Sequence, residues 1–250
     1  MSRDDALQKS QRIYFENEFL EGSISLIGGA IDDLELKTYD KSLKSNEKIQ
    51  LLNPISTNDG YTFNTGWATK SDIKTPKLDT KWVLKGSNKL TPNNPIQIFF
   101  ENDDGIRFER KISIDNKYLF SVKQTIINKS KKTIKFYPYA IINRNNIPSD
   151  LTDFYILHEG YTLISGEELV EVDYDDVFEK KHTTEGNSGV LIQGDKYWMT
   201  SIIPEQGRNF RFDLDYNNKY RASYIDLKGY EVRPNTVIEH NVKSLMGAKE

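Results

Sequence analysis

The chain has 250 residues, contains no cysteine, and carries 34 basic against 37 acidic side chains, for a net charge of −3. A chain of this length can form one large all-β domain or two smaller ones, and it can bury enough surface to fold without covalent cross-links. The absence of cysteine excludes a disulfide framework, a thiolate zinc site and a cysteine nucleophile. The near-balanced, well-mixed charge argues against a nucleic-acid-binding surface, so we expect no nucleic-acid partner.

No segment has the pattern of a membrane anchor or an export signal. No apolar run approaches the ~18 residues that a spanning helix needs. Residues 1–6 are too polar to open the apolar region of a signal peptide. We expect the chain as given to be soluble, and if it is exported, the exporting segment lies outside this sequence.

The N-terminal third predicts a polar lead-in followed by short strands. Residues 1–11 are polar with a weak helical pattern, and we expect a linker or a disordered N-terminal segment. From Ile13 onward apolar residues alternate with polar ones, the period of a half-buried strand. Gly28 and Gly29 supply the backbone freedom for a turn between strands. Asp32 and Asp33 follow, and since adjacent strand residues point to opposite faces, we expect a turn-edge feature and no acid/base dyad.

Residues 96–138 carry the clearest alternation in the chain. Apolar residues occupy every second position, and the alternation is interrupted at residues 102–105, 115–117 and 128–130. The first interruption contains Asp104-Gly105, a strong signal for a tight hairpin because its central residues need positive φ. The pattern predicts a four-stranded antiparallel meander.

A second hairpin is predicted around residues 189–206. A buried strand leads into Gly194 and Asp195, a turn pair, and a second apolar run starts at Tyr197 and Trp198. Pro204 ends that run because proline cannot donate to a sheet ladder. We expect Trp198 to belong to the core and not to bind a ligand.

The rest of the chain is less informative. Further short strands are expected at residues 49–52, 61–63, 82–84, 210–212, 222–225 and 237–245, with an exposed loop at 71–78. Residues 141–181 have no regular period. We therefore predict an all-β fold with little helix, in which residues 12–250 form one domain.

The histidines and carboxylates do not form a recognisable reactive pattern. His240 alternates with apolar residues on a strand and is expected to face inward with its hydrogen bonds satisfied, and neither His158 nor His182 has a second ligand at metal spacing. An acidic group around residues 173–179 lacks the mid-loop glycine of a calcium loop and is expected to be a solvated face. That group consists of Asp173, Asp175, Asp176 and Glu179, and Asp213 and Asp215 are also expected to be exposed. We expect no catalytic residue, no metal site and no cofactor.

Many short motifs resemble, in order and spacing, the periplasmic domain of the bacterial membrane-protein insertase YidC. The resemblance runs from about residue 13 to residue 250, and we call the nine residues that carry it best the signature residues. They are Gly66, Trp67, Asp115, Tyr118, Asp195, Lys196, Tyr197, Trp198 and Pro204. Val190 departs from the family pattern, in which tryptophan is frequent at this position.

The resemblance implies a large antiparallel β-supersandwich on the periplasmic face of the bacterial inner membrane. It further implies a non-catalytic domain that contacts the Sec translocon, in particular its SecD/SecF subunits, and nascent membrane proteins. Residues 141–181 are the candidate partner segment, because interaction residues often lie on loops held by a rigid scaffold. No residue of the family's membrane-embedded groove can be named in this sequence.

The same fold class is shared with sugar-binding and sugar-isomerising proteins, which leaves one alternative. An aldose-epimerase-like enzyme needs a histidine acid and a carboxylate base facing each other across a sugar, and His158 and His182 lie in no matching motif. A carbohydrate-binding role would need aromatic rings exposed as a stacking platform. The 14 tyrosines and 3 tryptophans fall mostly at inward strand positions, which favours a core.

Overall fold

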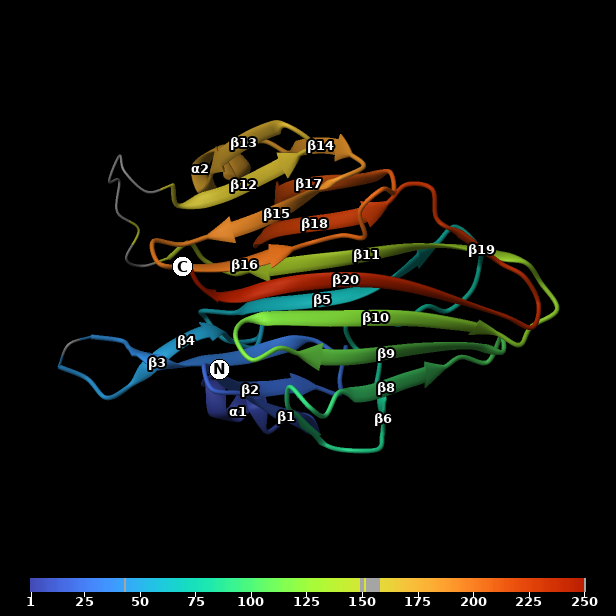
Figure 1. The fold of residues 1–250 in the computed structure, drawn as a ribbon, viewed down its shortest axis with the longest axis horizontal. Helices are drawn as coiled ribbons and strands as arrows, with labels where there is room; N and C mark the ends of the chain where they lie inside the picture. The colour runs from blue at the N-terminus through green and yellow to red at the C-terminus, as the bar shows by residue number, and fades with distance from the viewer. Residues whose placement is uncertain (43, 149–150, 152–157, 250) are drawn as a thin grey trace.

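The computed structural model describes residues 1–42, 44–148, 151 and 158–249, and shows two large β-sheets packed face to face (Figure 1). One sheet has eleven strands in the order β14-β17-β18-β11-β5-β3-β2-β1-β7, with β4 beside β3 and β19 beside β11. The other has nine strands in the order β13-β12-β15-β16-β20-β10-β9-β8-β6. The predicted all-β supersandwich is confirmed.

The strand bounds follow the alternation in the sequence. The eleven-stranded sheet contains β1 (Arg12–Glu16), β2 (Leu20–Ser25), β3 (Ile31–Asp40), β4 (Lys48–Leu52), β5 (Tyr61–Thr69), β7 (Lys89–Leu90), β11 (Ile134–Arg144), β14 (His182–Gly186), β17 (Phe210–Tyr216), β18 (Tyr220–Asp226) and β19 (Tyr230–Val232). The nine-stranded sheet contains β6 (Val83–Lys85), β8 (Ile96–Glu101), β9 (Ile106–Ile114), β10 (Leu119–Asn128), β12 (Gly160–Ser165), β13 (Glu168–Asp173), β15 (Gly189–Gly194), β16 (Trp198–Ile202) and β20 (Thr236–Ala248). The described part of the chain has two short helices, α1 (Arg3–Leu7) and α2 (Tyr174–Glu179). Neither helix is long and apolar enough to cross a bilayer.

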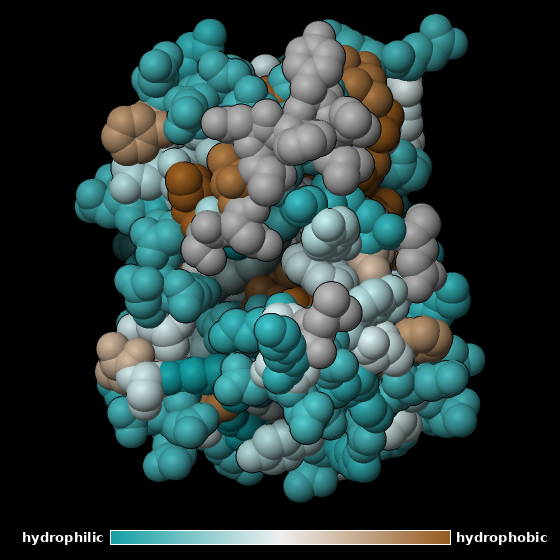
Figure 2. All heavy atoms as spheres, turned by 90° about the vertical axis from the view of Figure 1, so that its left-hand side faces the viewer, coloured by the Kyte–Doolittle hydropathy of each residue, from teal (hydrophilic) through white to brown (hydrophobic). Residues whose placement is uncertain are grey.

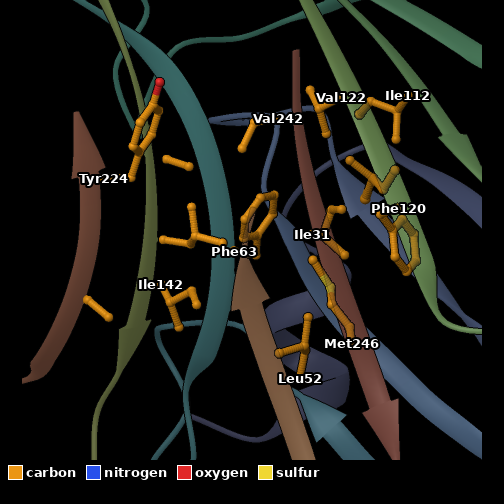
Figure 3. Packing of buried hydrophobic residues seen from close by; sticks show 14 of the residues in the cluster. Ile31, Leu52, Phe63, Ile112, Phe120, Val122, Ile142, Tyr224, Val242 and Met246 are labelled. Atoms are coloured by element: carbon orange, nitrogen blue, oxygen red, sulfur yellow. The ribbon is translucent and has the colours of Figure 1, made fainter. Parts of the chain in front are cut away.

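The core lies between the two sheets and consists of their inward-facing side chains. Figure 3 shows Phe63 from the eleven-stranded sheet and Phe120 and Met246 from the nine-stranded one within this core, and all three are almost fully buried. The Phe120 ring also meets the Phe15 ring edge to face at 5.2 Å between centroids. Burial of rings of this size dominates the stability of a sandwich.

The predicted four-stranded meander is only partly present. Strands β8, β9 and β10 do form consecutive antiparallel pairs. The next strand, β11, is in the other sheet, where it pairs with β5 and β18, and the second neighbour of β10 is β20 over ten residue pairs. Alternation reports a buried face and not the identity of the neighbour, so a crossover between sheets looks like a hairpin in the sequence. The Asn128 amide holds this crossover by donating to the carbonyls of Lys132 and Val232.

The aspartate pair differs from the expectation, and the weak helical pattern in residues 1–11 corresponds to a short helix. Residues 1–11 include α1, which is attached to the sheet by an ion pair between Arg3 and Asp33. Asp32 and Asp33 are both buried in β3, and Asp32 pairs with the buried Arg12, so they are not a turn-edge feature. Burial raises the pKa of Asp32 even though Arg12 opposes the shift.

Two further expectations are wrong, one about the exposure of an aspartate and one about the regularity of a segment. Asp213 is 6% exposed, because Lys181, Thr183 and Arg211 all donate to it at 2.8–2.9 Å. Although burial alone would raise the pKa of Asp213, these donors lower it below its ordinary value. Residues 141–181 are also more regular than expected, since β12 and β13 form a hairpin followed by α2, while residues 149–150 and 152–157 lie outside the described residues.

The second predicted hairpin is confirmed, with one change. Strands β15 and β16 pair from Leu191 opposite Ile202 to Gly194 opposite Met199. Trp198 is only half-buried, packed against the edge of the core, with its ring 4.9 Å from that of Tyr39. Tyr197 is 52% exposed.

Candidate functional site

Six of the nine signature residues lie around the last residues of β20, at the end of the sandwich where the chain terminus is marked in Figure 1. Strand β16 pairs with β20 through Trp198 opposite Ala248, and the Lys249 amide donates to the Tyr197 carbonyl at 2.8 Å. Lys196 places its ammonium 5.1 Å from the centre of the Tyr197 ring. The signature residues of the β15–β16 hairpin therefore hold the final residues of β20 from one side.

The other side of β20 is held by the turn between β9 and β10. The Tyr118 carbonyl accepts from the Met246 amide at 3.0 Å, and a side chain at Gly247 would overlap the Tyr118 ring. Asp115 fixes this turn because its carboxylate accepts from the amides of Lys117 and Leu119 at 2.8 and 2.9 Å. The end of β20 is thus clamped from both neighbouring strands.

A buried polar cluster packs against the turn between β15 and β16, which contains Asp195. Arg144, at the end of β11, donates to the Asp195 carboxylate at 2.5 Å and to the Tyr174 hydroxyl at 3.3 Å. The Tyr174 hydroxyl in turn donates to Asp195 at 3.2 Å, and the Arg144 guanidinium lies 4.6 Å from the centre of the Tyr61 ring. A charge-assisted network of this kind, shielded from water, holds the turn rigidly.

The electrostatics of this cluster fix the charge states of its arginine and of two of its tyrosines. Burial would lower the pKa of Arg144, but Tyr174 and Asp195 raise it above its ordinary value. Burial, followed by the field of Asp195, raises the pKa values of Tyr61 and Tyr174. The arginine stays charged and both phenols stay neutral near neutral pH, so the cluster serves as a structural anchor.

The remaining signature residues have local structural roles elsewhere. Gly66 leaves room for the Tyr139 ring, which a side chain at that position would overlap. Trp67 is buried with its ring 6.1 Å from that of His240, and the Pro204 carbonyl accepts from the side-chain amide of Gln206 at 2.7 Å. The structure does not bring these three residues to the end of β20.

The histidines each already contact a partner. His240 is fully buried between the hydroxyls of Tyr224 (3.3 Å) and Tyr230 (3.2 Å), with Glu205 at 3.2 Å, as expected for an inward-facing histidine. His158 lies 3.4 Å from Asp173, and His182 faces the Asp176 carbonyl at 3.3 Å. An epimerase acid and base must leave space for a sugar between them, whereas His158 is in direct contact with the Asp173 carboxylate and His182 with a backbone carbonyl.

The structure also locates residues that the sequence did not single out. Arg144 follows an ordinary strand pattern, and no local signal marks it as the partner of Asp195, 51 positions later. In the described part of the chain, no three histidine, aspartate or glutamate side chains are close enough to hold a metal ion. Figure 2 faces this end of the molecule and shows mostly hydrophilic atoms, with hydrophobic atoms confined to small areas between them.

The fold places the chain among galactose mutarotase-like β-sandwiches. A galactose mutarotase-related enzyme from Lactobacillus acidophilus superposes with a TM-score of 0.62 at 12% identity, over 96% of this chain and 100% of that one. A putative aldose 1-epimerase from Escherichia coli K12 has a TM-score of 0.59 at 7% identity, over 96% and 99% of the two chains. At these identities the likeness concerns the fold alone.

The sequence identifies the family within that fold. The profile of the YidC periplasmic domain matches residues 12–250. The membrane protein insertase YidC of Pelagibacter ubique is 46% identical over 250 residues, which are 100% of this chain and 45% of that protein. That of Sinorhizobium medicae is 37% identical over 260 residues, 100% of this chain and 43% of that protein. The chain belongs to the YidC periplasmic domain family and spans less than half the length of these relatives.

Proposed function

We propose that this chain is a non-catalytic domain of a membrane protein insertase, on the periplasmic face of the bacterial inner membrane, that supports the insertion and folding of membrane proteins. Its partners would be the SecD/SecF subunits of the Sec translocon and nascent membrane proteins. Family membership across residues 12–250 and relatives named as membrane protein insertases support this proposal. Insertion itself needs a path into lipid that satisfies backbone polar groups, which is a task for membrane-spanning helices.

The observation that carries the proposal is the structural role of the signature residues. Six of the nine close around the end of β20, and one of these six, Asp195, forms a buried ion pair with Arg144. Residues used in this way keep one rigid geometry at the end of a strand. A domain that must present a fixed surface to partners needs that rigidity.

The partner surface remains proposed within residues 141–181. In the described part of this segment, Leu169 on β13 and Phe178 on α2 are 60% and 59% exposed. Large exposed apolar side chains beside an open strand edge are features that partner proteins use. These two residues are the first to substitute.

The test uses a full-length insertase that carries this domain. Deletion of the domain should weaken co-purification of SecD/SecF but spare insertion of a substrate that does not need Sec. Leu169→Asp with Phe178→Asp should reproduce the loss, while Val237→Asp, which alters an equally exposed residue on β20, should not. If insertion of the simple substrate collapses while the protein stays abundant and Sec association survives, the accessory role is wrong.

The fold likeness to mutarotases favours one second candidate, a sugar-binding or epimerase-like activity. Galactose mutarotation followed by polarimetry tests it directly. We expect no turnover above the spontaneous rate. A turnover that His158→Ala or His182→Ala abolishes would establish the enzyme instead.

A further inference from the structure

Two short segments supply the strands that border the two opposite sides of the sandwich. Residues 70–90 contain β6 and β7, the last strands of the nine- and eleven-stranded sheets on one side. Residues 167–186 contain β13, α2 and β14, which border both sheets on the other side. In Figure 1, β6 lies at the bottom of the front sheet, and β13 lies at the top with α2 and β14. We call residues 70–90 the basic edge and residues 167–186 the acidic edge.

The two edges carry opposite charge. The basic edge has six lysines and two aspartates, a net charge of +4, while the acidic edge has eight carboxylates and two lysines, a net charge of −6. All six lysines of the basic edge are exposed. Nine strands at about 4.8 Å spacing separate the edges by on the order of 40 Å. That distance exceeds the ~8 Å over which charges act in physiological salt, so each edge meets its surroundings independently.

Most of the lysines on the basic edge have no carboxylate partner. Among the described residues, Lys70, Lys77, Lys81 and Lys85 form no ion pair. The Lys74 ammonium lies over the Phe100 ring at 5.9 Å, and Lys89 reaches Glu16 at 3.3 Å. The sheet continues the positive surface, because the exposed Lys111 on β9 is one strand beyond Gln97, the partner of Lys85.

Exposed aliphatic side chains lie among these lysines. Val83 is 50% exposed and alternates with Lys85 on β6 and with Lys81 just before it, and all three side chains are exposed. Ile27 pairs directly with Lys81 in an isolated bridge and is 42% exposed. Leu78, 60% exposed, lies beside Gly28. Lysines around aliphatic side chains form the pattern of a surface that sits on lipid headgroups.

Three observations favour a bilayer over an acidic protein as the occupant. The cations are all lysines, hydrated point charges without the planar fork that suits a defined carboxylate partner. They are spread along an edge strand and its loops. The side chains between them are aliphatic, with Val83 next to the half-buried Phe99 across the strand pair.

We propose that the basic edge docks onto a bilayer surface that contains anionic phospholipid, which leaves the acidic edge on the far side of the domain. This rests on the proposed function only in that a membrane is then close at hand. Each lysine near an anionic surface contributes about a fivefold factor in affinity. The exposed aliphatic side chains add binding that salt does not screen.

The experiment measures co-sedimentation of this chain with vesicles. Vesicles of phosphatidylcholine alone are compared with vesicles of equal parts phosphatidylcholine and phosphatidylglycerol. We expect binding to the anionic vesicles that weakens as salt rises. Lys81→Gln with Lys85→Gln should lower the partition coefficient by roughly 25-fold, and Lys81→Glu with Lys85→Glu should lower it further. Val83→Ser should lower the part of the vesicle binding that persists at high salt.

The matched control is Lys131→Glu with Lys132→Glu, the same charge change at exposed lysines outside the basic edge, and it should retain most of the binding. Three outcomes overturn the proposal. They are absence of binding to anionic vesicles at low salt, equal loss in the control and in the edge variant, and capture by soluble polyglutamate without vesicle binding. Because no Sec subunit is present, this result is independent of the deletion experiment.

Discussion

The basic and acidic edges meet the same structural requirement with opposite charge. An edge strand exposes unpaired backbone groups, and proteins protect such edges by short length and by charged side chains. Strands β6 and β7 have three and two residues, and β13 and β14 have six and five. Charged side chains of either sign protect a strand edge from pairing. The presence of lysines on one edge and carboxylates on the other is therefore not required for protection and can serve a function.

Each edge is also anchored by a buried arginine, and the two arginines differ in their partners. Arg144 beside the acidic edge pairs with Asp195 and contacts Tyr174 of α2. Arg110 beside the basic edge stacks on Trp82 at 4.2 Å and donates to the carbonyls of Gly28, Gly29 and Thr65. Within the described residues Arg110 forms no ion pair with a carboxylate, and burial lowers its pKa to about 10. One anchor is an ion pair, and the other is a cation held by backbone dipoles.

The largest effect is expected from breaking the ion-pair anchor. Arg144→Met leaves the Asp195 carboxylate buried without its cation, which should cost about 3–5 kcal/mol of unfolding free energy in urea titrations. Arg144→Met combined with Asp195→Leu should cost less than the single change, because no charge is then stranded. Arg110→Met strands only carbonyls and should cost about 1–3 kcal/mol. An additive double variant would contradict the ion-pair anchor.

A somewhat smaller loss of stability is expected when acid protonates His240, which lies on β20 in the middle of the nine-stranded sheet. Burial lowers the pKa of His240 from 6.5 to about 4, with Asp226 opposing and Arg208 reinforcing the shift, and Tyr224, Tyr230 and Glu205 surround the ring. The folded state therefore binds a proton less readily than the unfolded chain. The associated stability is complete above pH 6.5 and is lost as pH falls from 6.5 towards 4, by up to about 3 kcal/mol.

His240→Gln is the control, because it removes this titration while keeping a polar side chain. Urea unfolding of both proteins at several pH values isolates the histidine from the carboxylates, which titrate in each. The wild type should lose more stability than the variant over this window. Parallel loss in the two proteins would mean that His240 is not held neutral.

A moderate effect is expected at the clamp on β20. Complete truncation of a buried tryptophan costs about 3–5 kcal/mol, and Trp198 is half-buried, so Trp198→Ala should cost about 2 kcal/mol. Thermal and urea unfolding measure it. Unchanged stability together with altered binding of a sugar or peptide would make Trp198 a contact residue and not part of the packing.

The smallest effect on stability is expected for substitutions on the basic edge, where the effect on vesicle binding should be large. Lys81→Glu with Lys85→Glu changes exposed, unpaired side chains, and the unfolding free energy should move by no more than about 0.5 kcal/mol. The same variant should lose its binding to anionic vesicles. A large destabilisation would show that the lysines support the fold, and the contrast between the two edges would then lack functional meaning.

The sequence predicted the features that depend on neighbours in the chain. The turn at Asp115, the β15–β16 hairpin and the inward position of His240 all follow from turn chemistry and from a period of two. The sequence predicted which residues belong to the candidate site, but it did not predict that six of them meet at the end of β20. Nothing local connects Tyr118, Asp195 and Gly247, and only the pairing of β20 with β10 and β16 brings them together.

By itself, the sequence determined the all-β class and, where the alternation is regular, the strand positions and the buried face, because burial on one face imposes alternation on the chain. The tertiary structure alone decided which sheet β11 joins, since alternation does not name a neighbour. It also decided the distribution of charge. Along the chain the charges are balanced and look well mixed, but two segments about 80 residues apart form opposite edges of the sandwich and carry net charges of +4 and −6. Charges act across space and not along the sequence, so their separation exists only once the sheets have formed.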